Sequence, residues 1–102
     1  MIEYRGEDYK EVIDNKGLVL VDYFATWCGP CKMLMPVLEE MSNEVTEMPV
    51  YKVDIDKFRP LAIDSQIKSV PTLVLYKDGK EVARQSGYQP REKLEAWIEQ
   101  YK

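Results

Sequence analysis

The sequence contains no histidine and only two cysteines, Cys28 and Cys31, and both scarcities restrict the metals that it can hold. Structural zinc takes four cysteine or histidine ligands in a closed site. One copy of this chain cannot supply four such ligands, so a zinc site would need two chains. We therefore expect no bound metal and another use for the cysteine pair.

Long hydrophobic runs and a strong net charge are also absent. The longest aliphatic run, Leu18 to Val21, is too short to span a bilayer, and Met1 to Tyr4 lack the charged and apolar regions of a signal peptide. We expect no membrane partner and a reducing cytoplasmic location, where a structural disulfide is unusual. The net charge is −4 and no basic stripe occurs, so we expect no nucleic-acid partner.

The composition is typical of a folded domain. Hydrophobic residues make up 45% and charged residues 31% of the 102 positions, which is too apolar for a disordered chain. A chain of this length buries roughly two thirds of its surface on folding. We expect one domain that covers residues 1–102.

Hydrophobic spacing predicts alternating helices and strands. The helices are expected at 7–15, 32–45 and from Pro90 onward, with a short helix opened by Pro60, and the strands at 18–24, 50–55, 71–76 and 81–85. A crossover helix between the first two strands makes them parallel, whereas Asp78-Gly79 predicts an antiparallel hairpin between the last two. The fold class is therefore α/β, a mixed sheet of four to five strands with helices on both faces.

The two cysteines lie where the first long strand gives way to a helix, in Trp27-Cys28-Gly29-Pro30-Cys31-Lys32. The free N–H groups and positive dipole of a helix N-terminus favour a thiolate at the first cysteine. The second cysteine follows one turn later on the same face, close enough for a disulfide. The pattern predicts a redox switch with Cys28 as the attacking thiol and Cys31 as the resolving thiol.

Asp22 interrupts the same strand, and its neighbours on that face, Leu20 and Phe24, are apolar. Burial without a partner would raise the pKa of this carboxyl. A raised pKa suits a general base that takes a proton from Cys31. The alternative is an aspartate at a strand end that points to water.

The run from Val21 to Lys32, together with Val70-Pro71-Thr72, Lys77-Asp78-Gly79 and Gly87, resembles the thioredoxin family over essentially the whole chain. The resemblance implies the thioredoxin fold with four helices and a general protein-disulfide reductase that serves cell redox homeostasis. It also implies a monomer without a bound cofactor, whose electrons come from NADPH through a thioredoxin reductase and whose partners are disulfide-containing client proteins.

The resemblance also implies roles for single residues. Lys52 would pair with Asp22, and Pro71 would be cis and face the disulfide, with the backbone of Val70 ready to pair with a client strand. The remaining client-binding residues would form a small apolar surface: Trp27, Gly29, Pro30, Val70 and Gly87. Ser86 stands where the family often has an apolar residue.

Several alternatives remain open from the sequence. The same fold serves disulfide oxidants and isomerases, and a non-catalytic module would use the apolar surface only to hold a partner. Lys52 and Pro71 also have plain explanations, as a solvated lysine and as a residue that starts a strand.

Overall fold

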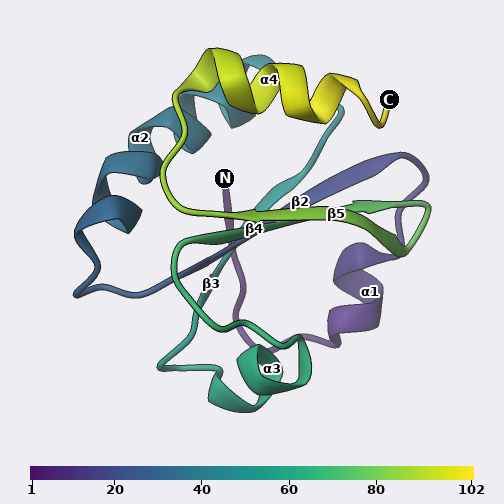
Figure 1. Ribbon diagram of the computed structural model, residues 1–102. Helices are drawn as coiled ribbons and strands as arrows, with labels where there is room; N and C mark the ends of the chain where they lie inside the picture. Colours follow the sequence, from purple (N-terminus) through teal and green to yellow (C-terminus); the bar gives the residue numbers. More distant parts are fainter.

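A five-stranded mixed sheet forms the centre of the computed structural model, which describes all 102 residues. The strand order is β1-β3-β2-β4-β5, with α2 and α4 on one side of the sheet and α1 and α3 on the other (Figure 1). The elements in chain order are β1 (Ile2–Glu3), α1 (Tyr9–Ile13), β2 (Leu18–Phe24), α2 (Gly29–Glu44), β3 (Val50–Asp54), α3 (Arg59–Asp64), β4 (Thr72–Lys77), β5 (Lys80–Ser86) and α4 (Arg91–Glu99). The predicted fold class is confirmed.

Strand β2 lies in the middle of the sheet because both of its faces are apolar. It pairs in parallel with β3 and antiparallel with β4. The crossover helix α2 accounts for the parallel pair, and the Asp78-Gly79 hairpin makes β4 and β5 antiparallel, as predicted. Asp78 and Gly79 both have positive φ, 52° and 83°, which is the backbone of a two-residue hairpin turn.

Two separate hydrophobic cores fill the space between the sheet and its helices. On the side of α2 and α4, Leu20 and Leu73 pack with Leu34, Leu38 and Leu94. On the opposite side, alternate residues of the same strands pack beneath α1 and α3: Val19, Val21, Tyr23, Val53, Val74 and Tyr76. The cysteine pair therefore belongs to a helix that is held along its length by the first core.

Helix boundaries differ from the predictions where capping decides them. Helix α2 begins at Gly29, three residues earlier than predicted, because Cys28 acts as its N-cap and Pro30 occupies its first turn. Helix α1 is shorter than predicted and is capped by Asp8, whose side chain accepts from the Lys10 N–H. None of the four helices combines the length and the hydrophobicity that crossing a membrane requires.

Helix α3 ends at a residue with left-handed backbone that is not glycine. Gln66 has φ +57°, and its N–H donates to the Ile63 carbonyl at 2.9 Å. The next N–H, of Ile67, donates to the Ala62 carbonyl at 3.0 Å. This pair of bonds is the Schellman motif, in which the left-handed position is usually glycine because a Cβ costs about 1–2 kcal/mol there.

We expect Gln66→Gly to raise the free energy of unfolding by about 0.5–1 kcal/mol, since relief of the Cβ clash exceeds the added entropy of the unfolded chain. Chemical denaturation measures the change. Asp64→Gly is the matched control, because Asp64 lies in the last turn of α3, where glycine costs about 1 kcal/mol. Equal destabilisation of the two variants would show that Gln66 is not strained.

Candidate active site

The turn from β2 into α2 brings Cys28 and Cys31 together as a disulfide, with their Cα atoms 5.2 Å apart. Cys28 has extended backbone, as an N-cap residue should, and the Cys31 N–H points at its Sγ atom at 3.2 Å. This amide is one of the N–H groups that have no partner inside the helix. In the reduced protein it would donate to a Cys28 thiolate, which would also lie at the positive end of a 16-residue helix.

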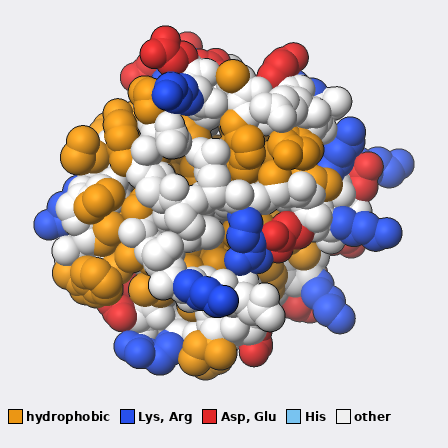
Figure 2. Space-filling view, in the orientation of Figure 1, with side chains coloured by type: hydrophobic (Ala, Val, Ile, Leu, Met, Phe, Trp, Pro, Cys, Tyr) orange, Lys and Arg blue, Asp and Glu red, His pale blue; other side chains and the backbone are white.

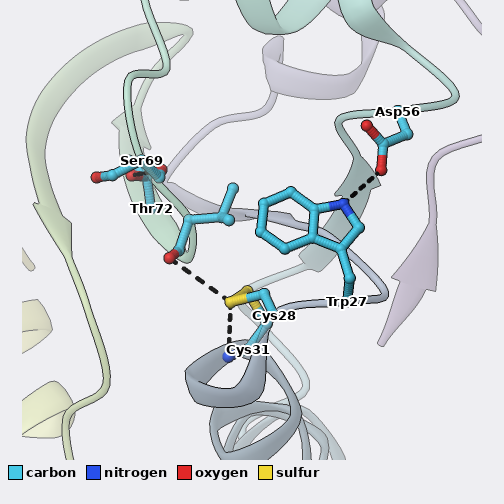
Figure 3. Close-up of a disulfide and its surroundings, with 7 residues drawn as sticks. Trp27, Cys28, Cys31, Asp56, Ser69 and Thr72 are labelled. Atoms are coloured by element: carbon cyan, nitrogen blue, oxygen red, sulfur yellow. Dashed lines mark hydrogen bonds between the residues drawn. A yellow bond between two sulfur atoms is a disulfide. The ribbon is translucent and has the colours of Figure 1, made fainter.

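The two cysteine residues differ in their exposure to solvent by less than the sequence suggests. Cys28 is 5% exposed and Cys31 is 1% exposed. Both pack against Ala25, with Phe24, Ile55 and Val70 at the edge of the cluster. Cys28 is the sulfur on the open side, where Trp27 and the loop after Ser69 flank it (Figure 3). Cys28 is therefore the cysteine that a molecule in solution reaches first.

The loop between α3 and β4 covers the disulfide. The Val70–Pro71 bond is cis, as the resemblance implies, and the Val70 carbonyl oxygen lies 3.6 Å from Cys28 Sγ. Val70 has no backbone hydrogen bond to any other residue, so its N–H and C=O remain available to an added strand. Gly87 closes the far side of this loop, since its N–H donates to the Pro71 carbonyl at 2.9 Å.

Asp22 lies inside the protein, which removes the alternative of an aspartate that points to water. Its side chain is 0% exposed, and neither carboxylate oxygen has a hydrogen-bond partner. Burial raises the pKa of Asp22 to about 7, and the positive charge of Lys52 offsets part of that rise. Asp22 lies on the face of β2 that α2 covers, the same helix that carries Cys31.

Lys52 is in register with Asp22 on the neighbouring strand but forms no direct ion pair with it. On its other side Lys52 is in register with Glu3 of β1. In-register neighbours share a face of the sheet, so the lysine stands between two carboxylates. This arrangement leaves the Asp22 carboxyl without a charge-assisted hydrogen bond, which is why burial decides its pKa.

Gly29 and Pro30 form the exposed rim of the site at the start of α2. A Cβ built on Gly29, or on Gly87 across the site, meets no atom within 4 Å. Neither residue between the cysteines carries a charge. The groups that favour a thiolate here are therefore those of the helix terminus.

The family model described as Thioredoxin matches residues 1–100. The chain belongs to the thioredoxin family. It is a thiol-disulfide oxidoreductase with a redox-active cysteine pair, as the motif at Cys28 and Cys31 predicted.

Known thioredoxins match most of the chain. It is 51% identical over 78 residues to a thioredoxin of Chlamydia trachomatis, an alignment that covers 76% of each chain. It is 45% identical over 91 residues to thioredoxin C-2 of Corynebacterium nephridii, covering 88% of this chain and 84% of the relative. A mutant thioredoxin from Halobacterium salinarum superposes with a TM-score of 0.89 at 39% identity, covering 98% and 88% of the two chains. Plasmodium falciparum thioredoxin gives a TM-score of 0.89 at 35% identity over the whole of both chains.

Trp27 lies beside the thioredoxin disulfide with 67% of its surface exposed. Its Nε1–H donates to Asp56 Oδ2 at 2.9 Å, which holds the ring against the rim of the site (Figure 3). Asp56 also lies 3.4 Å from the guanidinium of Arg59. Sequence reasoning missed Asp56. The signal was present, because β2 and β3 are parallel and Trp27 and Asp56 both follow the carboxyl ends of these strands.

Proposed function

We propose that this oxidoreductase is a general protein-disulfide reductase of a reducing cytoplasm, recharged from NADPH by a thioredoxin reductase. The observation that carries the proposal is the position of Cys28, at a helix N-terminus, 3.6 Å from the free backbone of Val70. This geometry pairs a nucleophile with a site for an extended client segment. A dithiol that donates electrons must itself be kept reduced, which favours a reducing compartment and a recharging partner.

The reaction then proceeds by two thiol-disulfide exchanges. The Cys28 thiolate attacks one sulfur of the client disulfide, which forms a mixed disulfide and releases the other client sulfur as a thiolate. Asp22 accepts the proton of Cys31, and the Cys31 thiolate attacks Cys28 Sγ. The second client thiolate leaves, and the Cys28–Cys31 disulfide remains for the reductase to open.

Positioning of the reacting groups contributes more to the rate of these two exchanges than the acidity of the thiol does. A thiol with a lowered pKa is ionised more often, but each thiolate is then a weaker nucleophile. The resolving step is different, because Cys31 lies one helical turn from the mixed disulfide. An intramolecular attack of this kind gains from an effective concentration far above that of any free thiol.

The direction of the reaction follows from what stabilises the reduced form. A disulfide is strongly oxidising when the protein over-stabilises its thiolate. Here Gly29 and Pro30 add no charge, and the buried carboxyl of Asp22 opposes a thiolate when it is ionised. We therefore expect the dithiol form to be strongly donating.

The equilibrium reduction potential should lie below about −230 mV, on the side of the scale where thioredoxin itself lies. Equilibration with glutathione buffers, followed by alkylation of free thiols, measures it. A value above about −200 mV would move the chain to the oxidants or isomerases.

An insulin-reduction assay distinguishes a catalytic protein from one that only binds its partner. The wild-type chain, supplied with NADPH and a thioredoxin reductase, is expected to reduce insulin disulfides with consumption of NADPH. A variant with both cysteines replaced by serine keeps Trp27 and Val70 but has no thiol, so it should bind without turnover. Equal behaviour of the two proteins would favour the non-catalytic module.

A further inference from the structure

The end of the molecule that carries the cysteine pair is more basic than the rest of the chain. The loops and short elements that form it, residues 26–35, 55–72 and 81–88, contain five Lys or Arg against three Asp or Glu. The remaining residues contain nine Lys or Arg against fifteen Asp or Glu. Figure 2 shows acidic side chains gathered at the top, over α4, while basic side chains are spread over the right and lower parts of this face with a few acidic ones among them. An acidic protein therefore presents a basic end to its clients.

Two of the three acidic groups at this end are already engaged. Arg84 donates two hydrogen bonds of 2.7 Å to the carboxylate of Glu81. Asp56 holds Trp27 and lies beside Arg59. The lysines of this end, in contrast, form no ion pair: Lys32, Lys57 and Lys68.

A polar hollow of about 460 Å³ lies beside the loop that covers the disulfide. None of its seven lining residues is hydrophobic, and they include Lys68, Ser69, Thr72, Arg84 and Ser86. Ser69 directly precedes Val70, whose carbonyl lies 3.6 Å from Cys28 Sγ. The hollow therefore begins one residue away from the backbone on which a client would pair.

Hydrogen bonds decide which lining groups are free. Thr72 Oγ1 donates its single proton to the Ser69 carbonyl at 2.6 Å, so the Ser86 hydroxyl, 2.9 Å away, must donate to Thr72. Arg84 is held by Glu81 and by the Gln66 carbonyl at 3.3 Å. The charged group left without a partner is the ammonium of Lys68. The hollow thus offers the unpaired cation of Lys68, and its one carboxylate, that of Glu81, is neutralised by Arg84.

We propose that the polar hollow receives an acidic side chain close to the disulfide cysteine of a client, an inference that rests on the proposed reductase function. A strand rises about 3.3 Å per residue, so a side chain one or two residues from a cysteine at Cys28 reaches the hollow. A client carboxylate in the hollow is attracted by the positive charge of Lys68, whereas a client lysine is repelled by it. Clients with Asp or Glu next to the disulfide are reduced faster than clients with Lys.

The test uses short peptides joined as homodimers by one disulfide and identical except at one residue. Glu, Gln or Lys is placed in turn at each of the two positions on either side of the cysteine. The pre-reduced chain is mixed with each peptide, and the second-order rate constant is measured by acid quenching and chromatography. The proteins are wild type, Lys68→Gln, Lys68→Glu and Lys16→Glu. Lys16→Glu makes the same charge change as Lys68→Glu, in the loop before β2, at the end of that strand opposite Cys28.

At one or more positions, wild type is expected to reduce the Glu peptide about fivefold faster than the Lys peptide at low salt, with the ratio falling as salt is added. Lys68→Gln should remove most of the preference, Lys68→Glu should reverse it, and Lys16→Glu should retain it. A preference that survives Lys68→Glu, or that Lys16→Glu also abolishes, overturns the proposal. Equal rates for all peptides with wild type also overturn it while leaving the reductase function intact. Reduction of none of them means that the reductase function itself fails.

Discussion

Cys28→Ser is expected to lower the rate of disulfide reduction to that of the uncatalysed reaction, whereas Cys31→Ser should trap the client as a stable mixed disulfide on Cys28. Cys28 is the sulfur on the open side of the site, beside the free backbone of Val70. Cys31 is 1% exposed and lies inside the first turn of α2, where a client disulfide cannot reach it. Serine is a far weaker nucleophile than a thiolate, so in neither variant can the serine carry out the step of the cysteine that it replaces.

Mass spectrometry after exposure of each reduced variant to a disulfide substrate distinguishes the two roles. Cys31→Ser should carry one covalent client per chain, bound through Cys28. Cys28→Ser should carry none over the same time. Adducts that form on Cys31 at the same rate would reverse the assignment of attacking and resolving thiols. Circular dichroism of both variants controls for loss of the fold.

Asp22→Asn is expected to raise the free energy of unfolding at pH 8 by about 4 kcal/mol and to leave it nearly unchanged at pH 4. The folded protein holds the pKa of Asp22 at about 7, against 3.8 for the free side chain. Well below pH 3.8 the carboxyl is protonated in both states, so it costs nothing, and at pH 4 most of the cost is still absent. As the pH rises from about 4 to 7, only the unfolded chain loses this proton, and the folded state is progressively destabilised. Above pH 7 both states are ionised and the full cost remains, about 1.4 kcal/mol for each unit of pKa difference.

Urea denaturation of the oxidised wild-type and variant proteins at pH 4, 6 and 8 measures this difference. Asparagine matches the protonated carboxyl in shape, so the two proteins should converge at low pH. Asp64→Asn, on the exposed surface of α3, is the control for charge removal and should not show the same dependence. A constant difference between wild type and Asp22→Asn across the pH range would contradict a buried titrating carboxyl.

The same variant reports on catalysis. Without a base for Cys31, turnover of Asp22→Asn should fall most below about pH 8 and recover as the pH approaches the pKa of a free thiol. The pH profile of the rate therefore separates a proton acceptor from a structural residue. An equal loss of rate at every pH would assign Asp22 a structural role alone.

Local patterns in the sequence are sufficient for the architecture and for the reacting atoms. The Cys-Gly-Pro-Cys spacing places two thiols one helical turn apart whatever surrounds them, and Asp78-Gly79 requires a tight hairpin. The run of apolar residues on both faces of β2 makes it central and leaves Asp22 as the one residue that does not fit. Each of these features depends on residues that are only a few positions apart in the chain. Local backbone geometry determines how such residues lie relative to one another, so the sequence alone predicts their arrangement.

Features that join distant segments were decided only by the tertiary structure. The bond from Trp27 to Asp56 depends on the register of β2 with β3, and the absence of a direct ion pair between Asp22 and Lys52 depends on how their side chains lie on one face of the sheet. Charges that are interspersed along the chain are brought together in space, so that Lys68 lines a polar hollow beside the loop that covers the disulfide. Helical and strand periodicity fixes which face a residue occupies, but strand register and loop closure determine which distant residue it meets. The chemistry of the thiols could therefore be predicted from the sequence, whereas the side chains that surround the thiols in space could not.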